Sequence, residues 1–386
     1  MRNLTKMNDG NDLSAVLENL SRRNLLKGAG AAALLAAVGA GLPGKALADT
    51  LAHVSFVGWE GYDAGFHIGD FLKKNNAAID TTYINTTEDI ITKLRSGGMG
   101  TVDLTNFSQM YVALMGQSGL LAPIEADKLK NFSQLMPFFQ TLEGMEADGK
   151  RYGVPFTFSS CPLIYNPKMV SSPPTSWKDF LKPEYKGKVA LFSDVMTNVV
   201  VWAPVATGTR TPTLLTPAEL KETIDLLIKL KKEHVRAMPA SLGDGADLLI
   251  RGEAAMIMGW EPMVLWCKAK GVTVEIAKPV EGTWAFIDTF NIANNAPNHD
   301  LDLTFIDQAI SLDAQLKFGN DNFLGVVNAQ AAKQMSPEVQ KLYNFANLDE
   351  YFAQAHIYPR MFPAESDGVH VTYEEMLDGY ERFLKA

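Results

Sequence analysis

The residues of this chain that could do chemistry are aromatic and acidic, and they stand in a few short segments. Trp59 and Tyr62 lie among glycines directly after an apolar run at 53–58 that predicts a strand. Asp288 lies within the otherwise apolar run 284–290, where a carboxylate must be paired or face a ligand, because burial without a partner is costly. Aromatic faces attract cations, and a desolvated carboxylate makes charge-assisted hydrogen bonds. These residue types therefore suit the binding of an organic cation.

Each of these residues also has a purely structural interpretation. Trp59 and Tyr62 could pack in a core, although two large aromatics among glycines fit a binding loop better. Asp288 could cap backbone amides at a hinge. Both interpretations stay open on the sequence alone.

Motifs for catalysis, metal binding and cofactor binding are missing from the sequence. H-E-x-x-H, C-x-x-C and G-x-S-x-G do not occur, and the six histidines show no metal-ligand spacing. The two cysteines, Cys161 and Cys267, could pair in an oxidising compartment, but we expect two separate buried thiols. We therefore expect no catalytic residue, no metal site and no cofactor, and a protein that is not an enzyme.

The elements that must position the aromatic and acidic residues alternate between apolar runs and amphipathic stretches, which predicts an α/β fold. A chain of 386 residues usually makes two domains. The helix expected at 217–234 has start signals in Thr216, Pro217 and Glu219. The other expected strands are 82–84, 102–104, 188–192 and 254–258, and the other expected helices are 65–75 and 88–95.

The charge balance limits the partners. The net charge is −9, and no cluster of basic residues occurs. This composition argues against nucleic acid and against an anionic membrane surface, and it is compatible with a cationic ligand.

The N-terminal stretch has the layout of an export signal. Arg22 and Arg23 precede an uncharged run at 28–44, and Ala46 and Ala48 are the small residues that a signal peptidase reads. The arginine pair indicates the twin-arginine route. A membrane anchor is the alternative, but the run is shorter than the ~20 apolar residues a span needs. We expect residues 1–48 to be removed and the mature protein to work in the periplasm.

Beyond these features, the chain resembles the putrescine/spermidine-binding family, which are the extracellular solute-binding proteins of ABC importers. The resemblance runs from about residue 54 to about residue 340, and the order of its landmarks makes it specific. In chain order they are GWEGY at 58–62, KLRSG at 93–97, DGKRYGVPF at 148–156, TSW at 175–177, KPEYKGK at 182–188, RGE at 251–253, GW at 259–260 and PVEGTWAFID at 279–288.

The resemblance implies the type II periplasmic binding protein fold, with two α/β lobes and a ligand cleft between them. One lobe would hold residues 49–157 and 289–333, and the other 158–288 and 334–386. Closure on the ligand would make the conformation that the ABC permease in the inner membrane recognises. We expect a monomer.

The resemblance also implies roles for single residues. Trp59, Tyr62, Trp260 and Phe286 would form an aromatic box, and Asp288 would bind the ammonium group. Ser108 would line the cleft. Asp194 matches another acidic position, although it could equally cap the following helix.

The chain departs from the family pattern at positions that would bind the second cationic end of a ligand. Met263 and Thr197 stand where the family can have acidic residues. Glu261 could substitute, although neighbouring positions on a helix or turn point differently. Arg360 falls near the C-terminal segment that reaches the cleft and would favour a ligand carboxylate, with a surface position as the alternative.

The expected function is therefore to bind a small organic amine for an ABC importer, either a polyamine or an amino-acid-like zwitterion. One alternative within the same fold is ferric-ion capture, which usually needs clustered tyrosines, and the sequence has no adjacent tyrosine pair. The other alternative is an exported enzyme, but the sequence contains no catalytic motif that would support it.

Overall fold

Two β-sheets organise the chain in the computed structural model, which describes residues 51–84, 86–358 and 360–386. The predicted export signal lies outside these residues. The larger sheet has eight strands, in the order β14-β7-β13-β3-β1-β2, with β4 and β15 also paired to β13. Its strands are β1 (Ala52–Gly58), β2 (Ala77–Tyr83), β3 (Leu104–Ser108), β4 (Leu121–Ala122), β7 (Val154–Cys161), β13 (Thr283–Ala293), β14 (Gly325–Val326) and β15 (Ala355–His356).

The smaller sheet has five strands, in the order β10-β9-β11-β8-β12. They are β8 (Leu163–Tyr165), β9 (Val189–Ala190), β10 (Val235–Ala237), β11 (Met256–Met258) and β12 (Glu275–Ala277). A separate two-stranded hairpin is formed by β5 (Glu146–Ala147) and β6 (Lys150–Arg151).

Helices cover both sheets. Those of the first half are α2 (Phe71–Lys74), α3 (Thr87–Lys93), α4 (Gln109–Gln117), α5 (Pro137–Gln140), α6 (Val195–Thr207) and α7 (Pro217–Glu233), with the short turns η1 (Tyr62–His67) and η5 (Trp177–Leu181). Those of the second half are α8 (Leu242–Ile250), α9 (Pro262–Ala269), α10 (His299–Ala309), α11 (Leu312–Asn322), α12 (Ala329–Gln334), α13 (Pro337–Tyr343), α14 (Leu348–Gln354) and α15 (Tyr373–Lys385).

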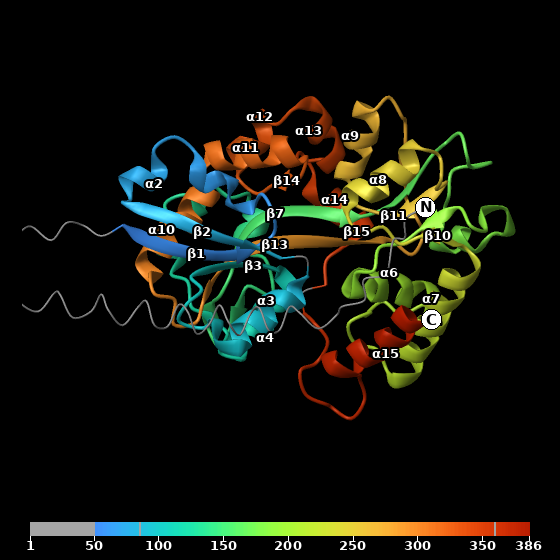
Figure 1. Cartoon of the computed structure of the whole chain (residues 1–386), viewed down its shortest axis with the longest axis horizontal. Helices are drawn as coiled ribbons and strands as arrows, with labels where there is room; N and C mark the ends of the chain where they lie inside the picture. The colour runs from blue at the N-terminus through green and yellow to red at the C-terminus, as the bar shows by residue number, and fades with distance from the viewer. Residues whose placement is uncertain (1–50, 85, 359) are drawn as a thin grey trace, which may run out of the picture. The chain divides into compact units, whose positions relative to one another are not determined.

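Two long strands carry the chain between the sheets. β7 of the larger sheet leads directly into β8 of the smaller one, and β12 of the smaller sheet returns to β13 of the larger one. β7 and β13 are antiparallel neighbours, and Figure 1 shows them running from the half with β1 and β2 toward the half with α8. This arrangement is a two-lobed α/β fold, as predicted. The residue boundaries of the lobes stay a prediction.

β13 is the central strand of the larger sheet. Every residue after Thr283 is buried, and the strand pairs with both β3 and β7. Continuous apolar runs of this kind are typical of strands covered on both faces. The sequence around Asp288 therefore places a carboxylate in the middle of the sheet.

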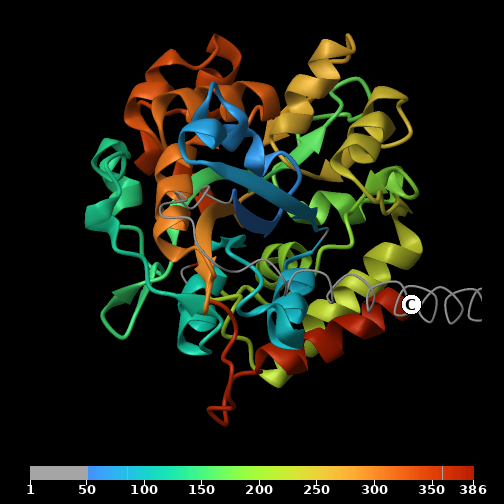
Figure 2. The ribbon, with the colours of Figure 1, turned by 60° about the vertical axis from the view of Figure 1, so that its left-hand side comes forward.

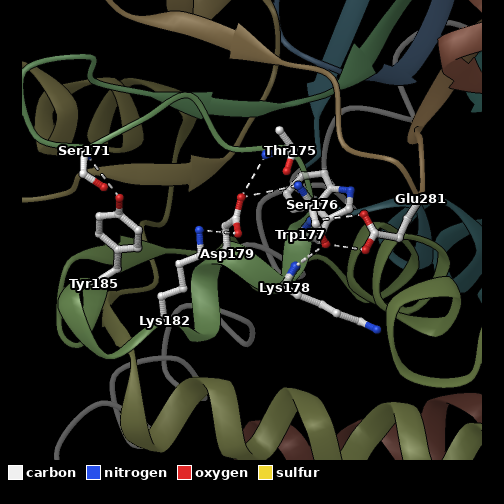
Figure 3. Close-up of polar contacts among 9 residues, drawn as sticks. All are labelled: Ser171, Thr175, Ser176, Trp177, Lys178, Asp179, Lys182, Tyr185 and Glu281. Carbon is white, nitrogen blue, oxygen red and sulfur yellow. Dashed lines mark hydrogen bonds and ion pairs between the residues drawn. The ribbon is translucent and has the colours of Figure 1, made fainter.

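The start of β13 is anchored to the lobe of the smaller sheet. Glu281 accepts hydrogen bonds from Ser176 Oγ (2.5 Å) and from the N–H of Trp177 (3.2 Å), as Figure 3 shows. The indole N–H of Trp177 donates to the carbonyl of Gly282 (2.8 Å). Two landmarks that are far apart in the sequence are thus in direct contact.

The C-terminal segment touches both halves. Tyr343 and Tyr351, from α13 and α14, pack their rings against Phe158 in β7. α15 then lies along α7, as Figures 1 and 2 both show.

Several expected elements are confirmed. The strand at 53–58 is β1, and the helix at 217–234 is α7, whose N-cap Thr216 forms a reciprocal capping box with Glu219. Cys161 and Cys267 are both buried and are not bonded to each other, as expected.

Two expected elements differ from the structure. The strand expected at 102–104 begins at Leu104 and continues to Ser108, because the polar residues in it find partners across the sheet: Thr105 Oγ donates to Val57 O and Asn106 Nδ2 to Thr289 O. The helix expected at 65–75 is two short turns, η1 and α2, which are separated by Gly69 at φ +59°.

Candidate ligand-binding site

Asp288 and Tyr62 form the centre of the candidate site. Asp288 lies opposite Ser108 of β3 and Thr157 of β7 in the sheet register. The hydroxyl of Tyr62 donates a hydrogen bond of 2.5 Å to Asp288 Oδ2. Tyr62 opens η1, which follows β1 through a turn at Gly61 with φ +83°. The loop after the first strand therefore brings its tyrosine to the carboxylate of the central strand.

The carboxylate of Asp288 is unusually placed for a charged group. Its residue is only 7% exposed, and burial raises the pKa of the carboxyl to about 7, against a lowering by the Tyr62 hydrogen bond. No Lys, Arg or His of the described chain forms an ion pair with it. Oδ1 accepts no hydrogen bond from the described residues, yet it is not sealed from solvent. One oxygen is thus held by a tyrosine, and the other has no hydrogen-bond partner among the described residues.

Ser108 and Phe286 are neighbours of Asp288 in the sheet, and their contact with a ligand stays a prediction. Ser108, the last residue of β3, donates from Oγ to Gln109 Oε1 (2.9 Å), which also accepts the N–H of Ile287. Phe286 lies two residues before Asp288, so both side chains are on the same face of the sheet. The sheet register therefore gathers Ser108, Phe286 and Asp288, and the hydrogen bond from Tyr62 adds the tyrosine.

Trp59 and Trp260 have no hydrogen bond to Asp288 among the described residues. The carbonyl of Trp59 accepts the N–H of Tyr62 (3.2 Å), and its side chain is partly buried. Trp260 follows β11 and packs edge-on against Phe192, with ring centroids 4.9 Å apart. Their roles as walls of an aromatic box stay a prediction.

A second buried carboxylate, Glu261, is present where the sequence analysis gave only a weak indication. Glu261 is 4% exposed, and its Oε2 accepts hydrogen bonds from Ser159 Oγ (2.9 Å), the N–H of Ser160 (2.9 Å) and the hydroxyl of Tyr351 (2.7 Å). Burial raises the pKa of this carboxyl to about 7, although the hydrogen bonds lower it. The signal in the sequence was its position directly after Trp260.

Comparison with known proteins identifies the family. The model of the bacterial extracellular solute-binding proteins matches residues 68–347, which is most of the chain. The chain belongs to this family.

Relatives of this solute-binding protein include transport proteins for polyamines. The spermidine/putrescine-binding periplasmic protein of Escherichia coli strain K12 is 26% identical over 291 residues, which cover 74% of this chain and 80% of the relative. A spermidine/putrescine ABC transporter substrate-binding protein from Streptococcus pneumoniae has a similar structure, with a TM-score of 0.67 at 18% identity over 86% of this chain and 99% of that one.

The fold is also shared with a protein that has a different ligand. The binding protein MotA of A. tumefaciens B6, solved in complex with glucopine, gives a TM-score of 0.66 at 19% identity over 86% of this chain and 99% of that one. Structural likeness at these identities shows the two-lobed fold and does not identify a ligand.

Asp194 of this solute-binding protein lies at the N-cap of α6. Its Oδ1 accepts the N–H of Thr197 (2.7 Å), and the residue is exposed. This is the capping interaction that the sequence left open as the alternative. A contact of Asp194 with the ligand stays a prediction.

Arg360 lines a cavity of about 1400 Å³ that lies beside the C-terminal end of α6. Arg210, Lys278 and His356 line the same cavity, whereas Tyr62, Phe286 and Asp288 do not. Arg360 is exposed, in agreement with the alternative that it occupies a surface position. Its contact with a ligand carboxylate stays a prediction.

Two features are absent from the described residues. Among 51–84, 86–358 and 360–386, no group of three or more His, Cys, Asp or Glu side chains could hold a metal ion. Within the same residues, no helix has the length and apolar character needed to cross a bilayer.

Proposed function

We propose that this solute-binding protein captures a small organic amine in the periplasm and delivers it to an ABC permease. The ammonium group of the ligand binds Asp288 Oδ1, and aromatic side chains around it surround the attached carbon chain. The periplasmic relatives named for spermidine and putrescine support both the location and the ligand class.

The observation that carries the proposal is the buried carboxylate of Asp288 with one available oxygen. A carboxylate that is 7% exposed and has no cationic partner in the described chain is disfavoured in its ionised form. An ammonium ion supplies the missing charge and donates hydrogen bonds. A cation over an aromatic face contributes about 0.5–2 kcal/mol more, depending on how far water is excluded.

Ferric-ion capture fits the site less well, although tyrosines do gather there. Burial raises the pKa values of Tyr62, Tyr343 and Tyr351 well above their usual range. Tyr62 and Tyr351 donate their hydroxyls to Asp288 and Glu261, whereas a ferric ion requires phenolate ligands. Mass spectrometry for metals, on protein purified without added iron, tests this alternative directly.

Export by the twin-arginine route, with cleavage after Ala48, belongs to the same proposal. Mass spectrometry of the mature protein from the periplasmic fraction should give an N-terminus at Asp49. Replacing Arg22 and Arg23 together by lysine should leave the protein in the cytoplasm.

The ligand class is tested by thermal unfolding of the mature protein with a panel of amines. The panel holds putrescine, spermidine, γ-aminobutyrate, choline, betaine and aminoethylphosphonate. A ligand at 100 times its dissociation constant stabilises the protein by about 2.7 kcal/mol, which is a clear shift in Tm. A shift with amines supports the proposal, and a shift only with zwitterions would support the predicted role of Arg360. No shift with any amine would contradict it.

A further inference from the structure

The cavity of about 1400 Å³ beside the C-terminal end of α6 differs in charge from the rest of the chain. The chain segments that follow α6, β12 and α14 bound it. Its wall includes the cations Arg210, Lys278 and Arg360 but only one acidic residue, Glu281. The whole chain has the opposite balance, with 44 acidic against 35 basic residues. Positive charge is therefore concentrated at this cavity in a protein that is acidic overall.

The positive charges of the cavity wall are not neutralised by carboxylates of the described residues. Of the seven arginines there, four form ion pairs: Arg151, Arg236, Arg251 and Arg382. The other three are Arg95, Arg210 and Arg360, and two of these three line the cavity. Lys278 likewise has no ion pair within the described part of the chain. An anion that entered the cavity would thus meet guanidinium groups without a competing carboxylate.

Glu281, the acidic residue of the wall, is already occupied. Its Oε1 accepts the hydroxyl of Ser176 and its Oε2 accepts the N–H of Trp177, as Figure 3 shows. These hydrogen bonds attach the start of β13 to the turn η5. The carboxylate of Glu281 therefore serves the fold and forms no ion pair with the cations of the cavity.

His356 adds an imidazole to the same wall. Its ring lies against Gly282, where φ is +81°, and a Cβ atom built there would lie 2.2 Å from His356 Nε2. The glycine therefore makes room for the ring. Burial lowers the pKa of His356, and the positive charge of Arg210 lowers it further. An anion bound between these two side chains would counteract the effect of Arg210.

Apolar side chains complete the wall. Leu214 and Val280 are 41% and 82% exposed, and they are two of the seven exposed large hydrophobic side chains in the described residues. The rings of Phe138 and Phe352 stack with their centroids 4.6 Å apart. Such a wall favours an organic anion over an inorganic one, because a carbon skeleton can bury apolar surface while its oxygens bind the arginines.

We propose that this cavity is a second ligand site, which takes a small organic anion with two or more carboxylate or phosphate groups. Arg210 and Arg360 bind the oxyanion groups, since a guanidinium donates two parallel hydrogen bonds to a carboxylate or phosphate. Lys278 supplies a third positive charge. Sites for small molecules have volumes of about 300–1,000 Å³, so the cavity has room for such an anion.

This inference goes beyond the proposed function and does not depend on it. Tyr62, Phe286 and Asp288 do not line the cavity, and the charge at the amine site is of the opposite sign. A purely structural alternative exists for Arg210, because a cation near the C-terminal end of a helix is favoured by the helix dipole. That role would affect the stability of the protein and not its affinity for an anion.

Isothermal titration of the mature protein with citrate, at pH 7 and low ionic strength, tests the site. The wild type should bind citrate at least about 10-fold more tightly than acetate, because more than one charge-assisted contact forms. Arg210→Gln and Arg360→Gln should each weaken citrate binding by about 10-fold or more. Arg95→Gln is the matched control, because it removes the same charge from an arginine outside the cavity. It should bind citrate as the wild type does.

Two further measurements identify the anion and its place. Titration with 2,3-bisphosphoglycerate exchanges carboxylates for phosphates, and the tighter of the two ligands shows which oxyanion the arginines prefer. The imidazole resonances of His356 in NMR spectra, assigned with the variant His356→Gln, should shift when the anion binds. Those of His53, which lies outside the cavity, should not.

The proposal is overturned if the wild type binds neither citrate nor 2,3-bisphosphoglycerate. Undiminished binding in a folded Arg210→Gln or Arg360→Gln variant would overturn it too, and so would an equal loss in Arg95→Gln, which indicates non-specific attraction. Anion binding without a shift at His356 would place the anion elsewhere and contradict the proposal. None of these outcomes bears on amine binding, and a failure to bind amines would leave the anion site intact.

Discussion

Asp288 in the central strand and Asp302 in α10 are both buried aspartates, and they differ in what surrounds their oxygens. Burial raises the pKa of Asp288 to about 7 and that of Asp302 to about 8. Asp302 is fully buried, and both of its oxygens are sealed from solvent without a hydrogen-bond partner in the described chain. Asp288 instead has a tyrosine hydroxyl on one oxygen, and its other oxygen is not fully sealed from solvent.

The surroundings of Asp302 explain its own shift. The charge of Asp103 raises its pKa further, and the oxygens of Asp103 are already occupied by the N–H groups of Ser55 and Asn298. These surroundings favour the neutral, protonated form of the Asp302 carboxyl. A raised pKa alone therefore does not mark a binding site. The proposed site at Asp288 rests instead on an oxygen without a hydrogen-bond partner in the described chain, beside the hydroxyl of Tyr62.

The largest expected effect is a difference in amine affinity between substitutions of Asp288 and of Asp302. Asp288→Asn should weaken amine binding by about 2–5 kcal/mol, because it removes one partner of a buried charge pair. Asp302→Asn, the matched control, should leave the affinity unchanged. Isothermal titration of both variants measures the difference, and equal affinities would remove the distinction drawn between the two regions.

The next effect concerns the aromatic wall of the site. Trp260→Ala should weaken amine binding by about 0.5–2 kcal/mol through loss of a cation–π contact. Trp266→Ala is the control, because Trp266 is also a partly buried tryptophan but lies in α9. This variant should lower Tm without changing the affinity for the amine. If both variants lose affinity equally, the effect of Trp260 is one of stability and not of contact with the ligand.

The pH dependence of stability tests the sealed aspartate. The ordinary pKa of 3.8 rises to about 8 in the folded state, so the folded protein binds more protons than the unfolded chain between these values. The contribution of Asp302 to the free energy of unfolding is thus fully present below about pH 4, and it is lost as the pH rises to about 8.

Asp302→Asn removes this dependence. Relative to the wild type, the free energy of unfolding of the variant should fall less steeply with pH, by about 1 kcal/mol per pH unit between pH 5 and 7. Denaturant titrations across this range measure the slopes. Parallel curves would mean that Asp302 is ionised in the folded protein.

The smallest effect is expected at Asp194. Asp194→Ala should lower the free energy of unfolding by about 1 kcal/mol through loss of the N-cap, and Asp194→Ser should retain most of it. Because the residue is exposed, we expect the loss of amine affinity to be smaller than this. A larger loss of affinity in both variants would establish the predicted contact of Asp194 with the ligand.

The sequence could predict the parts of the site that stand out locally. Asp288 was identified because a carboxylate within an apolar strand is unusual, and Tyr62 because a tyrosine among glycines marks a loop. The structure adds the hydrogen bond between them, which joins residues 226 positions apart. No local pattern contains such a contact.

Glu261 shows why the rest could not be predicted. The position of its carboxylate is set by Ser159, 102 residues earlier in the chain, and by Tyr351, 90 residues later. The expected end of the third strand was wrong for the same reason, since Thr105 and Asn106 find their partners on β1 and β13.

The central claim is that Asp288 binds the ammonium group of an amine, and a crystal structure with bound 1,4-diaminobutane tests it most directly. The account predicts one ligand nitrogen within hydrogen-bond distance of Asp288 Oδ1 and the methylene chain against Phe286. A ligand bound away from Asp288, for example in the cavity that Arg360 lines, would contradict it.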